Sequence, residues 1–379
     1  MFWGPASGGV RRYIGAKRNW IAHHTAWQHS TVVPMAGGAA DEDDLVGVPS
    51  LPLPFAPGYR VARSRRRSAA RLLALAPDLI EAGDPYNLAW AALDAARELR
   101  VPAVAFAHSD IAALAWRVGG APAEAMAQRY LRRLYSQFSL VLAPGASLTQ
   151  RLRGLQLDAP VEQQPLGVDT RCFHPAAADP AWRQQFGLPA ATRLLLYAGR
   201  FSPEKNLPVL VEAVRRLGAG FALIALGGGP TPPQSTGQAR VIVLPFERNP
   251  RRLARAIASS DLFVHAGDIE TFGLAALEAM ACGTPVVAHA GGGLAELVDS
   301  RVGEAVAQGA ATAFAEAITA TVRRRREDLS AAARARSLPY DWGRVMPRLL
   351  QRYARLIDAA ARGARASQSA LPQLMAMSR

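Results

Sequence analysis

Short apolar runs alternate with segments of helical periodicity along most of this chain, and this alternation constrains the fold more than any other feature. The apolar runs do not alternate with polar residues, which is typical of parallel strands covered by helices on both faces. We therefore expect an α/β protein with doubly wound sheets. The predicted strands are residues 78–81, 101–107 and 140–143 in the first half, and 194–198, 221–226, 241–244, 262–265 and 285–288 in the second.

The length of 379 residues is sufficient for two domains. A hinge is expected at residues 165–169 (PLGVD) and 173–175 (FHP), where proline and glycine interrupt the alternation. We expect one doubly wound domain at residues 1–165 and a second at 166–339, followed by a helical tail at 340–379.

Two other segments interrupt the pattern. Residues 48–60 contain four prolines and are expected to form an ordered loop rather than a central strand. Beyond Ser337, apolar residues recur at the spacing of one helix face. They are Trp342, Val345, Leu349, Leu350, Tyr353, Leu356 and Ile357. Pro347 lies inside this pattern, so the helix either begins near it or kinks there. The last residues, 361–379, are expected to be frayed.

Composition excludes several classes of protein. No uninterrupted apolar stretch reaches the roughly 18 residues of a membrane-spanning helix. The first residues lack the charged and apolar regions of a secretory signal. Cys172 and Cys282, the only two cysteines, are too few for a disulfide framework or a four-cysteine zinc site. We therefore expect a cytoplasmic protein of enzyme size.

The net charge of +14 is distributed unevenly. Of the 44 basic residues, 42 are arginine, which indicates a coding bias, so their number alone says little. Residues 1–165 carry 18 basic and 13 acidic side chains, residues 166–322 carry 13 of each, and residues 323–379 carry 13 and 4. Such an excess raises nucleic acid or an anionic membrane surface as a partner.

The segment 267–285 (GDIETFGLAALEAMACGTP) has the pattern of a loop, a helix and a stop. Thr271 is placed to cap a helix over residues 272–282, which Gly283 and Pro285 would end. Backbone amides at the start of a helix bind phosphate. The amides expected to do so here belong to Phe272, Gly273 and Leu274.

Two glutamates frame this helix. Glu270 precedes it and Glu278 lies two turns inside it, about 12 Å further along at the helical rise. That distance is close to the span from a sugar across a diphosphate to a ribose, so the two carboxylates could accept hydrogen bonds from sugar and ribose hydroxyls. The alternative is that Glu270 only caps the helix electrostatically and Glu278 faces solvent.

A second motif, residues 197–208 (YAGRFSPEKNLP), follows a predicted strand and opens the next helix. Lys205 is informative because almost every other basic position is arginine, and a compact ammonium group reaches a single phosphate where a planar fork does not fit. Arg200 and Lys205 together could neutralise a diphosphate leaving group. The alternative is two solvated loop cations.

These segments together resemble the retaining GT-B glycosyltransferases of family 4. The resemblance runs from about residue 4 to 360. It rests on Glu270-x7-Glu278 with residues 280–288 (MACGTPVVA), a glycine-rich turn and Glu296. Residues 199–206 (GRFSPEKN) and 7–13 (SGGVRRY) complete it.

The resemblance implies a nucleotide-sugar site in residues 166–339, an acceptor site in residues 1–165, and a terminal helix that crosses back onto the first domain. By carry-over, Arg200 and Lys205 hold the diphosphate, Glu270 the donor sugar and Glu278 the ribose, while Gly9 lets its loop approach the donor. His108, at the end of a predicted strand, matches the family's histidine near the reacting sugar. An ordinary structural role for His108 remains the alternative.

The implied activity is transfer of a hexose from a UDP- or GDP-sugar to a hydroxyl of a glycan or lipid-linked acceptor, with retention. No metal and no cofactor other than the donor are expected. One alternative is a GT-B epimerase, which would convert the donor without an acceptor. The other is a nucleic-acid-binding protein. It would need exposed aromatics among its basic residues, whereas here the excess lies mostly on helices, so we expect no nucleic acid.

Three further patterns are given no function. The glycine runs at 227–229 and 291–293 do not complete a dinucleotide fingerprint. His23, His24 and His29 lack a carboxylate partner with metal-ligand spacing. The acidic run at 41–44 (DEDD) lies in a glycine-rich loop away from the donor motifs and is expected to be solvated.

The start of the chain leads to one more expectation. A glycine loop that approaches a ligand normally follows a buried central strand. Only residues 1–6 precede the Ser7-Gly8-Gly9 loop, and Gly4 and Pro5 among them are poor strand formers. A strand usually needs five or six residues. We expect the chain as printed to lack its first strand.

Overall fold

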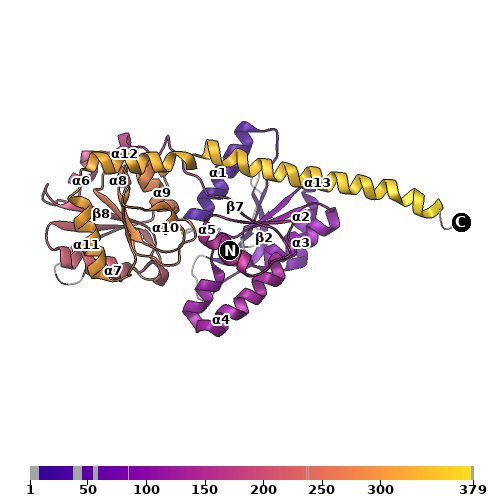
Figure 1. Cartoon of the computed structure of the whole chain (residues 1–379), viewed down its shortest axis with the longest axis horizontal. Helices are drawn as coiled ribbons and strands as arrows, with labels where there is room; N and C mark the ends of the chain where they lie inside the picture. The colour runs from indigo at the N-terminus through magenta and orange to yellow at the C-terminus, as the bar shows by residue number, and fades with distance from the viewer. Residues whose placement is uncertain are drawn as a thin grey trace.

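The computed structural model describes residues 8–36, 45–53, 59–83, 85–235, 237 and 239–376, with side chains described as far as residue 363. Figure 1 shows two groups of strands and helices side by side, with one long helix running along the amino-terminal group and projecting beyond it. The α/β class predicted from the alternation is confirmed. Residues 1–6, on which the expectation of a lacking first strand depends, lie outside the described residues.

The amino-terminal half contains two sheets. One has the order β1-β2-β3, in which β2 pairs with β1 in parallel and with β3 in antiparallel orientation. The other has the order β4-β5-β6-β7 and is entirely parallel. The elements are α1 (Gly9–His24), β1 (Thr31–Met35), β2 (Leu45–Pro52), β3 (Arg60–Ala62), α2 (Arg65–Ala74), β4 (Ile80–Ala82), α3 (Asn87–Leu99), β5 (Ala103–Phe106), α4 (Ile111–Tyr135), β6 (Leu140–Ala143), α5 (Ala146–Gly154) and β7 (Val161–Gln163).

The carboxy-terminal half is built on one six-stranded parallel sheet with the order β10-β9-β8-β11-β12-β13. Its central strands are almost completely buried, which explains their unbroken apolar sequences. The elements are α6 (Pro180–Gln184), β8 (Arg193–Arg200), α7 (Leu207–Leu217), β9 (Phe221–Gly228), β10 (Val241–Leu244), α8 (Pro250–Ala258), β11 (Leu262–His265), α9 (Leu274–Ala281), β12 (Val286–His289), α10 (Gly292–Leu297), β13 (Gly303–Val306), α11 (Ala311–Val322) and α12 (Arg326–Ser337).

The prediction of a loop at residues 48–60 is wrong for residues 48–52, because Leu45–Pro52 forms β2. The prolines occupy positions where the strand needs no N–H donor. Pro49 is the last residue paired with β1, and its carbonyl accepts a hydrogen bond from the N–H of Arg63. Pro52 is the last residue of the strand. Residues 54–58 lie outside the described residues.

The chain crosses between the halves twice, and the two crossings lie side by side. Val168 and Asp341 form an isolated parallel bridge, with Val168 N–H bonded to the carbonyl of Tyr340 at 2.9 Å. A Cβ atom on Gly167 would lie 2.3 Å from the Trp342 ring, so only glycine allows this close packing. The expected hinge segment is therefore held against the start of the last helix.

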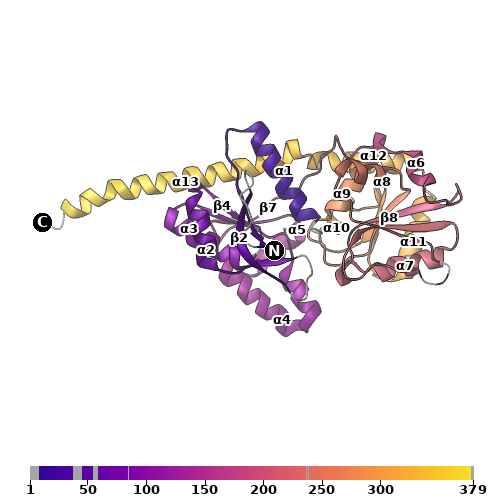
Figure 2. The ribbon, with the colours of Figure 1, turned by 180° about the vertical axis from the view of Figure 1, so that it is seen from behind.

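The last helix, α13 (Trp342–Ala376), begins five residues before Pro347. It carries the expected apolar positions inward, with Val345, Leu349 and Tyr353 at most 5% exposed. Figures 1 and 2 show it running along the amino-terminal half and projecting beyond it. The expected fraying from residue 361 is wrong, because the helix continues to Ala376.

Candidate active site

The residues selected from the sequence converge where the two halves face each other. Those of the carboxy-terminal half follow the carboxyl ends of β8 and β11, where ligands bind in open α/β sheets. His108 follows the end of β5 in the other half, and its carbonyl accepts a hydrogen bond of 2.8 Å from the hydroxyl of Thr271. One bond thus joins the loop of Glu270 to the segment of His108.

Glu270 lies at the centre of this site. Its Oε2 accepts a hydrogen bond from Lys205 Nζ at 2.6 Å and lies 3.5 Å from His265 Nε2. Burial acts to raise the pKa of Glu270, but Lys205, His265 and the N–H of Gly273 outweigh it, so the pKa is lowered. The carboxylate is therefore ionised and already bonded to the lysine that the sequence assigns to phosphate.

The neighbouring His265 is neutral. Burial, together with the charge of Lys205, lowers its pKa to about 4. Its Nδ1 accepts a hydrogen bond from the N–H of Gly267 at 3.2 Å, so the ring proton resides on Nε2, which faces Glu270. Its position at the end of β11 is the signal that the sequence analysis missed.

The prediction that Thr271 caps the helix of Glu278, α9, is wrong. The helix begins at Leu274 rather than Phe272, and its cap is Gly273 in the left-handed region at φ 92°. A Cβ atom there would lie 2.7 Å from Leu294, so a side chain would be both strained and crowded. Thr271 instead bonds to His108 across the cleft.

His108 has a buried ring with open hydrogen-bonding atoms. The ring stacks on Phe106 at 4.3 Å between centroids and lies 5.1 Å from Tyr13. Neither ring nitrogen has a hydrogen-bond partner within the described part of the chain. Burial lowers its pKa to about 4, so the imidazole is neutral and offers one donor and one acceptor. Most buried side-chain nitrogens are hydrogen-bonded, so the two of His108 are unusual in offering bonds to a ligand.

Glu278 does not face solvent, since the residue is only 1% exposed. One carboxylate oxygen bonds to the guanidinium of Arg12 from α1, while Oε2 has no partner among the described residues. Burial raises the pKa of Glu278, and Arg12 offsets only part of this rise. Arg12 was not expected to contribute, although it lies in the glycine motif of α1.

The two loop cations of the second motif are not free in solvent. Arg200 donates to Glu204 Oε1 and to the hydroxyl of Tyr59, each at 2.7 Å. Tyr59 belongs to the amino-terminal half, so Arg200 also spans the cleft. Arg200 and Lys205 each hold a carboxylate, and the alternative of solvated cations is wrong.

Gly9 also lies at the cleft. It is the first residue of α1, and a Cβ atom on it would lie 3.9 Å from Leu274 at the start of α9. A Cβ atom on Gly8 would lie 3.6 Å from the ring of Phe246. The amino ends of two helices, one from each half, therefore approach the same space.

Further contacts across the cleft were not expected from the sequence. Glu296 accepts hydrogen bonds at 2.8 Å from the backbone N–H groups of Ala146 and Ser147, at the start of α5. Arg117 of α4 pairs with Asp268. Glu296 had been noted only as part of a motif, and a long-range contact of this kind leaves no local pattern in a sequence.

The chain matches two family models. Glycosyltransferase Family 4 covers residues 7–171, and Glycosyl transferases group 1 covers residues 178–336. A GDP-mannose-dependent alpha-mannosyltransferase of Mycolicibacterium smegmatis is 32% identical over 308 residues, which is 81% of each chain. This chain belongs to glycosyltransferase family 4. It is an enzyme that depends on a nucleotide sugar, as expected.

Two other proteins resemble this glycosyltransferase over nearly its whole length. A GDP-mannose-dependent alpha-(1-6)-phosphatidylinositol dimannoside mannosyltransferase of Mycobacterium tuberculosis is 27% identical over 368 residues, covering 92% of this chain and 93% of the relative. Sucrose-phosphate synthase of Thermosynechococcus elongatus superposes with a TM-score of 0.71 at 20% identity, covering 93% and 94%. The latter match confirms the GT-B fold.

Other features of the glycosyltransferase lie outside this site. Within the described ranges, no group of three or more His, Cys, Asp or Glu side chains is placed to hold a metal, and no helix is both long and apolar enough to cross a bilayer. His23 bonds to the carbonyl of Asn19 and His24 stacks on Trp20. The acidic run at 41–44 lies outside the described residues.

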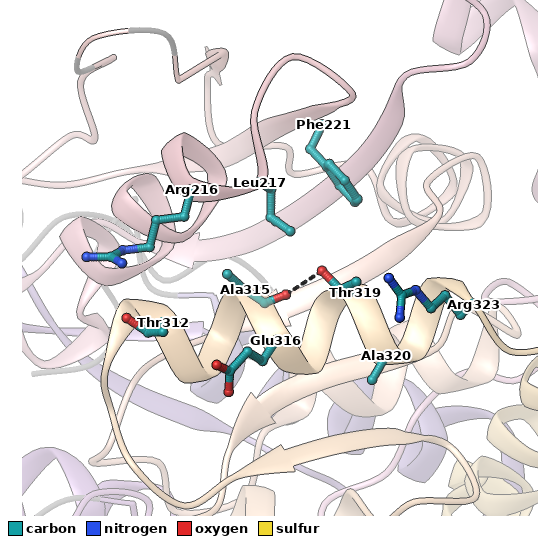
Figure 3. A pocket seen from close by; sticks show the side chains of 9 residues that line it. All are labelled: Arg216, Leu217, Phe221, Thr312, Ala315, Glu316, Thr319, Ala320 and Arg323. Atoms are coloured by element: carbon teal, nitrogen blue, oxygen red, sulfur yellow. Dashed lines mark hydrogen bonds between the residues drawn. The ribbon is translucent and has the colours of Figure 1, made fainter.

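A groove of about 580 Å³ lies between α7 and α11 (Figure 3). It is lined by Arg216, Leu217, Phe221, Thr312, Ala315, Glu316, Thr319, Ala320 and Arg323. Phe221 begins β9, so the groove opens at the amino ends of the strands. The candidate site lies at their carboxyl ends, and the groove is not part of it.

Proposed function

We propose that this glycosyltransferase moves mannose from GDP-mannose to a hydroxyl group of a lipid-linked acceptor, with retention of the anomeric configuration. The names of the two mannosyltransferases support the donor, and the phosphatidylinositol dimannoside of the second supports the acceptor class. In this proposal residues 166–339 bind the donor, residues 1–165 bind the acceptor, and residues 340–379 form the tail that packs on the acceptor side. No metal takes part.

One observation carries the proposal: the half-buried carboxylate of Glu270 and the neutral ring of His108 lie in segments bonded to each other across the cleft. Glu270 has the oxygens to accept hydrogen bonds from hydroxyls of the donor sugar. His108 has two unpartnered nitrogens in the half assigned to the acceptor. A sugar between them would meet acceptors and donors from both sides.

The rest of the donor would extend along α9. Lys205, Arg200 and the amides of Phe272, Gly273 and Leu274 would stabilise the diphosphate as it leaves. Glu278, with its unpartnered Oε2, would accept a hydrogen bond from a ribose hydroxyl. Arg12 would hold that carboxylate in place from α1.

The state of the nearby carboxylates favours one of the two routes by which a retaining transfer can proceed. A covalent intermediate needs a free carboxylate as the nucleophile, but Glu270 is bonded to Lys205 and Glu204 to Arg200. Glu81, below His108, is bonded to Lys17 and Tyr353. We therefore favour attack of the acceptor hydroxyl on the face from which the diphosphate leaves, with the departing phosphate oxygen taking its proton.

The acceptor half has a surface suited to an anionic membrane. The arginines of α2 and α4 come together there, with Arg65 and Arg133 at 5.1 and 5.9 Å from the ring of Trp90. Trp116, Val118 and Met126 of α4 are 57, 90 and 68% exposed. In this proposal the enzyme is cytoplasmic and docks peripherally at the inner face of the membrane. Each basic residue near an anionic surface contributes about 1 kcal/mol of electrostatic attraction.

The function is tested with purified protein and a panel of UDP- and GDP-sugars. We expect GDP-mannose to give the largest rise in melting temperature and a product whose new bond has the α configuration by NMR. A UDP-sugar as the only stabilising ligand would refute the assigned donor. Accumulation of an epimerised donor without acceptor would refute the transferase assignment.

Membrane docking is tested by co-sedimentation with phosphatidylcholine vesicles that contain or lack phosphatidylglycerol. We expect binding only to the anionic vesicles, weakened in the double variant Trp116→Ser, Val118→Ser. The matched control is Val243→Ser on β10, which is 44% exposed in the other half. Absence of binding at low salt would refute the membrane proposal.

A further inference from the structure

Arg117 of α4 reaches across the cleft to two loops of the other half, the β8 loop and the β11 loop, which directly follow those strands. Its Nη1 donates a hydrogen bond of 3.2 Å to the carbonyl of Pro203 in the β8 loop, two residues ahead of Lys205. Its Nη2 pairs with Asp268 in the β11 loop, two residues ahead of Glu270. One side chain of the amino-terminal half therefore contacts both loops that carry the central ion pair of the site.

The β8 loop and the β11 loop are also joined to each other. Besides the ion pair, the side-chain amide of Asn206 donates a hydrogen bond of 3.2 Å to the carbonyl of Ala266. A Cβ atom on Gly267 would lie 3.0 Å from the carbonyl oxygen of Glu204, so the two loops pack closely. The loops thus form one unit within their own half, and Arg117 ties this unit to the facing half.

The segment that carries Arg117 starts at His108. The carbonyl of His108 accepts the hydrogen bond from the hydroxyl of Thr271. Asp110 caps the first turn of α4 and pairs with Arg151 of α5 at 2.8 Å. Both ends of this short segment are therefore bonded to the carboxy-terminal half, one beside His108 and the other through Arg117.

The helix α4 is interrupted directly after this segment. Gly119 and Gly120 have non-helical backbone angles, and the φ of 62° and ψ of −157° at Gly120 belong to a region that is essentially restricted to glycine. A Cβ atom on Gly119 would lie 2.8 Å from the Cβ of Ala123. Residues 111–118 are consequently a helical piece of about two turns, separate from the longer remainder of α4. Its orientation depends on its own contacts, including those of Arg117.

We infer that Arg117 is a positioning residue for sugar transfer. It holds the loops of Lys205 and Glu270 in a fixed place relative to His108, so that the polar groups of both halves meet around one sugar. This role rests on the proposed function, in which His108 and Glu270 contact the transferred sugar, and Arg117 acts through the two loops. Arginine suits it, because a planar guanidinium presents several donors in fixed directions and can bond a carbonyl and a carboxylate together.

The test compares two variants at this position with a matched control. Arg117→Met removes both bonds and keeps an unbranched apolar stem. Arg117→Lys keeps a charge opposite Asp268 but lacks the fork that bonds both loops. The control is Arg215→Met, which breaks a half-exposed ion pair with Glu212 within α7 of the other half.

Amide hydrogen exchange is the first readout, because it requires neither donor nor acceptor. The N–H groups of Lys205, Asn206 and Gly267 are hydrogen-bonded within their own half, so their exchange reports opening of the two loops. We expect Arg117→Met to speed their exchange about fivefold or more. The melting temperature should change by less than about 3 °C, because an ion pair with side chains 30 and 35% exposed adds little to stability.

Turnover is the second readout, with GDP-mannose as the donor and octyl α-mannoside as the probe acceptor. We expect Arg117→Met to lower kcat about tenfold or more, since small displacements of positioned groups are costly. The dissociation constant for GDP should stay within about twofold of the parent value, because Arg117 does not act on the nucleotide. Arg117→Lys should recover part of the rate, and the control should match the parent enzyme.

Two results would overturn the inference. One is unchanged loop exchange and unchanged kcat in Arg117→Met. The other is a loss of GDP binding or of melting temperature in proportion to the loss of rate, which would show a merely structural role. A parent enzyme that transfers no mannose would count against the proposed function instead, and the exchange rates would still decide whether Arg117 holds the two loops.

Discussion

Lys205 and Glu270 are expected to be energetically coupled, which a double-mutant cycle can measure. Their side chains are 15 and 19% exposed, and the Nζ–Oε2 distance is 2.6 Å. Removing one partner of a buried pair leaves the other charge uncompensated, which costs about 3–5 kcal/mol when burial is complete. With this residual exposure we expect Lys205→Met and Glu270→Gln each to lose roughly 2–3 kcal/mol of unfolding free energy.

The double variant should lose little more than either single variant, so the coupling energy should be about 2 kcal/mol. The assay is urea unfolding followed by far-ultraviolet circular dichroism, with the slope against denaturant checked for constancy. The matched control is Arg215→Met with Glu212→Gln, an exposed pair on α7, which should show no measurable coupling.

Additive losses in the Lys205 and Glu270 cycle would refute the reasoning, because they would mean that the two charges are solvated independently. Activity gives a second readout. The double variant should be folded yet lack turnover, since both groups are assigned to the donor. Lys205→Arg should keep the charge but lower the rate, because the planar fork does not fit a point-charge position.

Three further variants test separate parts of the site. Glu278→Ala should raise the dissociation constant for GDP at least tenfold in calorimetry. Glu270→Ala should instead lower turnover without weakening GDP binding, since GDP contains the ribose but lacks the transferred hexose. The reverse pattern would exchange the two roles. Gly273→Ala should lose roughly 1–3 kcal/mol of stability because of its positive φ, while Gly154→Ala, with open space around it, should not. His265 takes up a proton on unfolding below pH 6.5, so stability falls as the pH drops from about 6.5 to about 4. His265→Asn should reduce the slope in that window by about 1.4 kcal/mol per pH unit, and an unchanged slope in urea titrations would contradict a neutral buried ring.

The apolar pattern predicted the carboxy-terminal sheet better than the rest of the fold. Buried parallel strands such as β10 and β11 carry continuous apolar runs, and both were predicted at their observed bounds. The prolines of β2 disguised a strand, because they fall where no donor is needed. The short strands β3, β7 and β13 were not predicted, because each contains a charged residue and none forms a continuous apolar run.

The sequence selected residues that the structure brings together, but it did not predict the contacts between them. Glu270 and Lys205 were selected because their types and spacing suit a sugar diphosphate, and His108 because it matches a histidine of the family that the chain resembles. Their mutual contacts depend on how the two halves meet, which no local pattern contains. Thr271 illustrates this, because it had the right type to cap a helix but bonds to the facing half instead.

The paired charges of the cleft determine how a donor would bind. Arg200, Lys205 and Arg12 each already hold a carboxylate, and residues 166–322 as a whole have no net charge. In the proposed function, an incoming diphosphate would therefore exchange partners with these carboxylates instead of meeting free cations. Binding should consequently depend less on salt than a count of cations suggests, because few counterions are released. The excess of +14 lies on residues 1–165 and 323–379, where, in the proposed function, it is available to an anionic acceptor surface.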